Sequence, residues 1–197
     1  MKVRISLISL LCCLGIYTGY SQTSDVDSLI SLLPNTAESA QKIELLLTIS
    51  RKLKESGSSE SIQYTDQAYA LAENLNIPQL SAKALLLKGE IYDINRRTQE
   101  AIELVSQAIN LFETANDKAG ISYASARLSN LYYFTYNGEE AIRHAERALL
   151  VAKETEVDSL QADACFQLGN GYYRQNDYSK AVEFHENALH IYEKIPD

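Results

Sequence analysis

One phrase recurs in the sequence at a fixed interval of 40 residues. An Ala or Ser is followed directly by Ile or Val, and an Ala stands seven positions after the first residue. The four copies are Ser61-Ile62 with Ala68, Ala101-Ile102 with Ala108, Ala141-Ile142 with Ala148, and Ala181-Val182 with Ala188. Each copy continues with apolar residues at helical spacing. Four copies in one register indicate a repeat protein, whose units bury their apolar faces by stacking on one another.

A second helical phrase stands twelve residues before each opening. It reads Gly89 with Tyr92, Ser129 with Tyr132, and Gly169 with Tyr172, whereas the first copy has Ile49 and Lys52. Polar turns separate the two phrases: Gly57-Ser58-Ser59, Asn95-Arg96-Arg97, Asn137-Gly138 and Asn176-Asp177. The chain has only eight Gly and three Pro, which favours long uninterrupted helices. Each unit is therefore predicted to be a helix, a tight turn and a second helix, with Ala or Gly where the two backbones approach closely.

The fourth copy resembles the tetratricopeptide repeat family nearly position for position. Its matching residues are Leu168-Gly169-Asn170, Tyr172-Tyr173, Asp177-Tyr178, Ala181 and Ala188-Leu189. The resemblance extends over residues 37–197. The usual period of this family is about 34 residues, so longer helices are expected around the junctions near Asn76, Asn116 and Val157. The resemblance implies an all-α, right-handed superhelical solenoid of antiparallel helix pairs.

The repeat divides the chain into one capping segment and four units. The units are expected at residues 37–76, 77–116, 117–156 and 157–197. Before them, residues 23–36 contain a short amphipathic stretch from Asp25 to Leu33 that ends at Pro34. A terminal cap of this kind covers the open face of a stacked array.

The first 22 residues have the three-part layout of a secretory signal peptide. Lys2 and Arg4 precede an apolar run from Ile5 to Ile16, and the small residues Gly19 and Ser21 follow. Cleavage after residue 21 or 22 is expected. An uncleaved anchor is the alternative, although this run is shorter than the roughly 20 residues that span a bilayer. The mature domain is therefore expected to be exported, periplasmic or secreted, without a membrane segment.

Composition limits the partners and the chemistry. A net charge of −8 argues against nucleic acid, which is bound by basic faces. Removal of the signal leaves one cysteine, Cys165, on an apolar helix face, where a buried packing role is expected. His185 and His190 are five residues apart, so they point about 140° apart on a helix and cannot share a metal. His144 and His185 are expected to be packing or surface residues. We expect no catalytic site, metal or cofactor.

In this family, the first helices of successive units form the inner, concave wall of the solenoid. The resemblance implies that this wall binds a partner. The residues that map onto its exposed stripe are Lys83, Glu90, Tyr123, Arg127, Asn130, Tyr133, Phe134, Phe166, Gln167, Asn170, Tyr173 and Arg174. Asn130 and Asn170 are similar to the asparagines with which some family members clamp a carboxylate. Leu46 and Leu86 stand where such a clamp has lysine, so Asn130 and Asn170 also fit as ordinary consensus residues.

Three functional hypotheses follow. The first is a non-enzymatic exported adaptor that binds a peptide or protein segment on its concave face. The second is the sensory region of a membrane signalling protein, a histidine kinase or helix-turn-helix regulator, of which this chain is a fragment. The third and weakest is a self-associating scaffold, because no solvating helix follows the fourth unit and a homodimer through that unit would cover its face.

Overall fold

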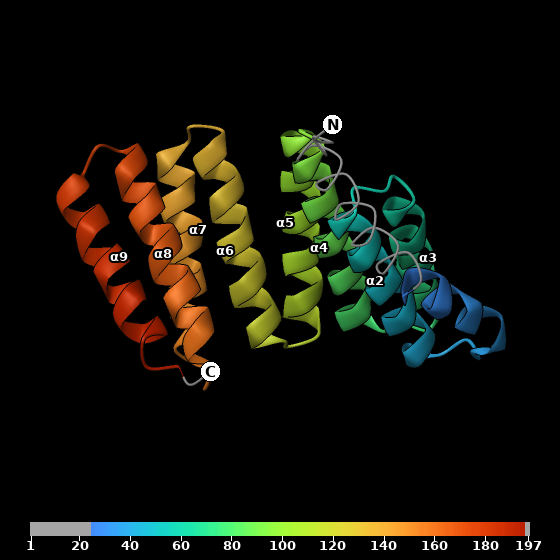
Figure 1. Cartoon of the computed structure of the whole chain (residues 1–197). Coiled ribbons are helices and arrows are strands. Elements are labelled where there is room, and N and C mark those ends of the chain that lie inside the picture. Colours follow the sequence, from blue (N-terminus) through green and yellow to red (C-terminus); the bar gives the residue numbers. More distant parts are fainter. Residues whose placement is uncertain (1–24, 196–197) are drawn as a thin grey trace, which may run out of the picture.

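The structure is a computed structural model that describes residues 25–195, and every regular element in that range is helical. The expected all-α fold class is confirmed. Figure 1 shows α4 to α9 side by side in chain order, with α2 and α3 at the α4 end of the stack; consecutive helices run antiparallel. They are α2 (Ala40–Glu55), α3 (Ser61–Asn74), α4 (Pro78–Ile94), α5 (Thr98–Thr114), α6 (Lys118–Phe134), α7 (Gly138–Ala152), α8 (Asp158–Arg174) and α9 (Tyr178–Tyr192). The predicted signal peptide, residues 1–22, lies outside the described residues.

One helix pair lies in each range assigned to a repeat unit, from α2 with α3 in the first to α8 with α9 in the fourth. Even-numbered helices are the first helices of their units and odd-numbered helices are the second. Residues 25–32 form a further helix, which the 3-10 turn η1 (Leu33–Asn35) connects to the first unit. Within residues 25–195, no helix is both long enough and apolar enough to cross a bilayer.

A small residue brings the two helices of each unit together. Ser129 on α6 is fully buried, and its hydroxyl donates to the carbonyl of Ala141 on α7 at 2.7 Å. Ser50 on α2 repeats this bond with the carbonyl of Ser61 on α3 at 2.9 Å. In the fourth unit the position is Gly169, where an added Cβ would meet the His185 ring at 2.1 Å. Gly or Ser is therefore required for the close approach of each pair.

The equivalent position in the first unit corrects one sequence assignment. Ser50 takes the place of Gly89 and Ser129, so the assignment of Ile49 to that place was wrong. The physical reason is that the chain from Ser50 to Ser61 is one residue shorter than the chain from Ser129 to Ala141. The register of α2 therefore slips by one residue against the 40-residue repeat.

Six of the turns are built around a residue with positive φ. The left-handed residues are Gly57, Asn76, Arg96, Asn116, Tyr136 and Asn176, with φ between 54° and 74°. At the end of α4, the amide of Arg96 donates to the carbonyl of Asp93 and the amide of Arg97 donates to the carbonyl of Tyr92, both at 2.9 Å. This pattern satisfies the last carbonyls of a helix and reverses the chain within three residues.

The hydrophobic core runs from one unit into the next. Val105 and Phe112 of α5 pack with Leu128 of α6 in one cluster, and all three are almost completely buried. At the beginning of the stack, Val26 from the N-terminal helix packs with Ile49 of α2. The N-terminal helix therefore covers the outer face of the first unit.

Candidate functional site

A groove of about 610 Å³ opens on the wall formed by the first helices. All four units contribute to it, through α2, α4, α6 and α8. The side chains and turns that line it are Arg51, Lys54, Lys83, Leu86, Leu87, Glu90, Phe112, Asp117, Ala119, Gly120, Tyr123, Val157 and Leu160. Its volume lies within the roughly 300–1,000 Å³ of ligand-binding clefts in proteins.

The groove lies where α4 and α6 separate. Gly120, near the start of α6, packs so closely on the Phe112 ring that an added Cβ would lie 2.4 Å from it. This contact holds α6 against α5 while the inner wall between α4 and α6 stays open. Leu86, Leu87 and Phe112 are almost completely buried and give the groove an apolar floor.

Three first helices place polar groups around one carboxylate in this groove. Glu90 on α4 accepts a hydrogen bond from Lys54 Nζ on α2, with 2.5 Å between Nζ and Oε2. From α6, the Tyr123 hydroxyl lies 3.2 Å from Oε1 of Glu90, and Arg127 Nε lies 3.9 Å from the same oxygen. The Glu90 side chain is only 15% exposed. We call these four residues the Glu90 cluster.

Tyr123 acts as the hydrogen-bond donor to Glu90. Burial of its hydroxyl is the main reason that its pKa is raised above the ordinary value, and the negative charge of Glu90 raises it further. The phenol therefore keeps its proton at neutral pH and donates to the carboxylate. Lys83, one turn before Leu86 and Leu87, pairs with Glu44 at 2.8 Å, and both side chains are more than a third exposed. Exposed pairs of this kind are weak and exchange partners readily.

The structure brings the sequence-predicted residues together in two groups. Lys83, Tyr123 and Arg127 belong to the groove or the Glu90 cluster. The residues of α8 instead contact the neighbouring helices of the last two units. Asn170 hydrogen-bonds His185 of α9 at 3.2 Å and accepts no bond from a neighbouring lysine. Its amide also donates to Gln167 Oε1 at 3.2 Å.

Arg174 is fixed by the preceding unit. Its guanidinium lies 4.1 Å from the ring centres of both Tyr133 and Tyr136, and its Nε donates to the Tyr133 carbonyl at 2.9 Å. These contacts stabilise the junction between α6 and α8. The remaining predicted aromatic residues are half-exposed and contact close neighbours, with Phe134 against Tyr133, Phe166 against His185, and Tyr173 against Tyr178. Asn130 lies half-buried on α6, outside the residues that line the groove.

Sequence reasoning missed Arg51 and Lys54, which line the groove from α2. In the slipped register of the first unit, Arg51 occupies the place of Glu90, Asn130 and Asn170. The only signal in the sequence is the shortened spacing from Ser50 to Ser61, which the strict 40-residue alignment conceals.

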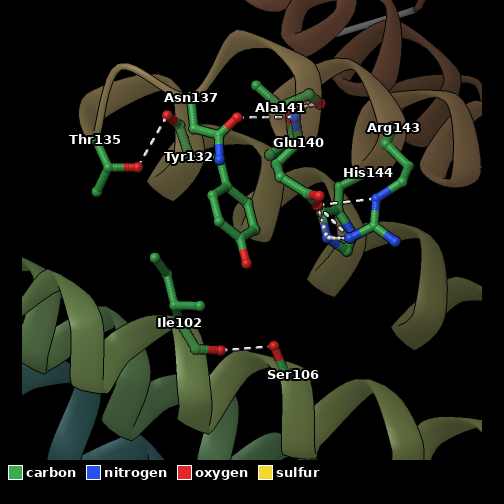
Figure 2. A network of polar contacts seen from close by, with 10 residues as sticks. Ile102, Ser106, Tyr132, Thr135, Asn137, Glu140, Ala141, Arg143 and His144 are labelled. Atoms are coloured by element: carbon green, nitrogen blue, oxygen red, sulfur yellow. Dashed lines mark hydrogen bonds and ion pairs between the residues drawn. The ribbon is translucent and has the colours of Figure 1, made fainter.

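The histidines take part in packing. Figure 2 shows His144 on α7 beside Arg143 and Glu140, with the Tyr132 ring nearby. His144 and Tyr132 stack with ring centres 5.4 Å apart and planes at 3°. Cys165 is buried, and this burial raises the pKa of its thiol. Among residues 25–195, no group of three or more His, Cys, Asp and Glu side chains has an arrangement that could hold a metal ion.

Comparison with known proteins identifies the repeat. A family model described as tetratricopeptide repeat matches residues 122–194, which contain nearly all of α6 to α9. The solved structures most like this one include a signal transduction ATPase with a tetratricopeptide repeat sensor from Pyrococcus horikoshii. Its TM-score is 0.75 at 19% identity, over 87% of this chain and 27% of that one. Residues 122–194 therefore match the tetratricopeptide repeat, and the helical stack of residues 25–195 has the fold of a protein that contains it.

Two further similar proteins are a phosphatase and a transcriptional activator. Aspartyl phosphate phosphatase F from Bacillus subtilis has a TM-score of 0.77 at 16% identity, over 89% of this chain and 49% of that one. The transcriptional activator NprA from Geobacillus stearothermophilus is 28% identical over 138 residues, which are 69% of this chain. The chain spans about a third of the length of NprA. At these identities the solved structures show a shared fold.

Proposed function

We propose that this tetratricopeptide repeat scaffold is a non-catalytic adaptor that binds an extended segment of a partner protein in the groove of its inner wall. The observation that carries the proposal is the groove itself, with its apolar floor and a charged rim contributed by successive first helices. Tyr123 and Val157, which line the groove and are partly exposed, supply contact area for a partner's apolar side chain above this floor. The floor residues Leu86 and Phe112 belong to the packed core, so the receptor loses little conformational freedom on binding.

We also propose that the adaptor works outside the cytoplasm. The support comes from the sequence of residues 1–22, whose basic start, apolar run and small residues have the layout of a secretory signal. N-terminal sequencing of the protein recovered from a periplasmic or culture fraction tests this. A new N-terminus at residue 22 or 23 is expected, and an intact Met1 in the membrane fraction would contradict cleavage.

The binding face is tested by blocking the groove. Ala119 lines the groove and is exposed, so Ala119→Trp fills the space without disturbing the core. Gln107→Trp places the same side chain at an exposed position on α5, outside the groove, and serves as the matched control. Peptides selected against the protein from a random library are then titrated by fluorescence anisotropy. Ala119→Trp is expected to weaken their binding at least tenfold, whereas Gln107→Trp leaves it unchanged. Equal binding to both variants would contradict the groove as the binding site.

A second candidate function is the sensory region of a larger signalling protein. The observation that favours it is the similarity to a transcriptional activator and to an ATPase with a tetratricopeptide repeat sensor, both much longer than this chain. A sensor must change shape when its ligand binds. Small-angle scattering with and without a selected peptide separates the two functions. A changed radius of gyration supports the sensor, and an unchanged one supports the adaptor.

A further inference from the structure

The Glu90 cluster contains three side chains of the kinds that bind a carboxylate ligand. Lys54 and Arg127 come from α2 and α6, on either side of α4, and both are directed at the single carboxylate of Glu90. Tyr123 adds a neutral donor to the same carboxylate. An ammonium, a guanidinium and a hydroxyl are the donors that bind carboxylates in proteins. In the structure, these three donors are directed at the carboxylate of the protein's own Glu90.

Within the repeat, only the second unit has a carboxylate at the position of Glu90. The equivalent places hold Arg51, Asn130 and Asn170, none of which carries a negative charge. The carboxylate is therefore not required by the helix packing at this position. Its effect is electrostatic, because it neutralises Lys54, which lines the groove, and Arg127 beside it.

The charge of the groove favours an acidic ligand. Its charged lining consists of three cations, Arg51, Lys54 and Lys83, and two carboxylates, Glu90 and Asp117. The Asp117 carboxylate is already engaged, since it accepts from the Gly120 amide at 2.8 Å and from Gln79 at 2.6 Å. The lining is therefore net positive in a chain whose net charge is −8. Such a local field attracts acidic segments and repels basic ones.

We propose that Lys54 and Arg127 bind an acidic side chain of the extended partner segment, and that Glu90 lowers the affinity by holding both cations in the free protein. The acidic residue lies next to a large apolar residue, which enters the floor formed by Leu86, Leu87 and Phe112. Arg51 and Lys83, on the same wall, add to the attraction. This inference rests on the proposed function, because it concerns the ligand of the same groove.

The probes are two pools of synthetic nonapeptides with fluorescent labels. One pool has Asp or Glu at its centre next to Leu or Phe, and the other has Asn or Gln in place of the acid. We expect the wild-type protein to bind the acidic pool about five- to tenfold more tightly than the amide pool, which is the size of one charge-assisted contact. The preference is expected to decrease as salt is added.

Three variants test the roles of the cluster. Glu90→Gln keeps the shape of the side chain and is expected to bind the acidic pool about fivefold more tightly than wild type, because Lys54 and Arg127 lose their internal partner. Lys54→Met and Arg127→Met are each expected to remove most of the preference for the acidic pool. Lys153→Met changes an exposed cation at the end of α7 and is the matched control, with unchanged binding. Circular dichroism melting confirms that each variant is folded.

The outcomes separate the inference from the proposed function. If both pools bind equally and Ala119→Trp blocks both, the groove binds peptides but the acidic preference is wrong. If Glu90→Gln binds the acidic pool more weakly than wild type, Glu90 positions the two cations and its proposed inhibitory role is wrong. If neither pool binds the wild-type protein, the inference and the proposed peptide groove both fail.

Discussion

His144 occupies a place in the third unit that an aromatic residue holds in the fourth. Tyr132 stacks on His144 with planes at 3°, and 40 residues later Tyr172 stacks on Phe184 with planes at 6°. Arg143 lies 3.3 Å from His144 Nε2, and a carboxylate oxygen of Glu140 lies 3.6 Å from the same nitrogen. Nδ1 is buried and has no hydrogen-bond partner within the described range. A second proton would place a poorly solvated charge beside Arg143.

This arrangement predicts a loss of stability in acid. Burial is the main cause that lowers the pKa of His144 to about 4; the charges of Arg143 and Arg147 lower it further, and the charge of Glu140 opposes them. The unfolded chain takes up the proton near pH 6.5, so the folded state loses stability as the pH falls from 6.5 toward 4. The loss is at most about 3 kcal/mol. Urea unfolding at pH 7 and pH 4.5 measures it.

His144→Phe reproduces the stack of the fourth unit without a titratable group. Its free energy of unfolding is expected to decrease less between pH 7 and pH 4.5 than that of wild type. His190→Gln alters an exposed residue of α9 and should keep the full wild-type decrease. If His144→Phe and wild type lost the same free energy, titration of His144 would not be responsible.

At the scale of the helix and its turn, Arg96 adopts a backbone conformation that favours Gly. Arg96 is exposed, with φ of 63°, and left-handed φ costs an ordinary L-residue roughly 1–2 kcal/mol. Arg96→Gly relieves this strain in the folded state, but Gly also gives the unfolded chain more entropy, which offsets part of the gain. The net expectation is that the free energy of unfolding rises by about 0.5–1 kcal/mol. Urea unfolding at neutral pH is the measurement.

Two other turns provide controls for Arg96→Gly. Asn tolerates the left-handed region, so Asn116→Gly should change stability by much less. Tyr136 has φ of 62°, but its ring stacks on Arg174, and Tyr136→Gly should lose that contact together with the strain. An equal gain at Arg96, Asn116 and Tyr136 would mean that backbone strain is not the cause.

The helices were predictable because their signal is local and repeated. The polar turns and the 40-residue phrase place the helix pairs, and the fold class is confirmed. The register of α2 was not predictable from the strict repeat, because a one-residue shortening between Ser50 and Ser61 is absorbed by the turn at Gly57. That shortening also concealed Arg51 and Lys54 as groove residues. Side-chain partners such as Arg174 with Tyr136 depend on conformations that residue spacing does not encode.

At the scale of the whole molecule, the two ends of the stack differ. Val26 and its neighbours cover the first unit, whereas Tyr178, Val182 and Leu189 on α9 are each more than half exposed. The residues 40 positions before Val182 and Leu189 are Ile142 and Leu149 on α7, which pack against α8. The exposed stripe of α9 therefore has the composition of an internal repeat contact. Exposed apolar faces of this kind promote association.

We expect this stripe to pair with the same stripe of a second copy at high protein concentration. Glu186 on α9 and Glu193 directly after its end lie beside the stripe, so two copies bring like charges together and salt should strengthen the pairing. Light scattering over a concentration series at low and high salt measures the mass. Leu189→Asp should keep the protein monomeric, whereas Leu150→Asp, which changes an equally exposed leucine on α7, should still dimerise. A monomeric wild type at every concentration and salt would contradict self-association, and equal loss of the dimer in both variants would place the contact elsewhere.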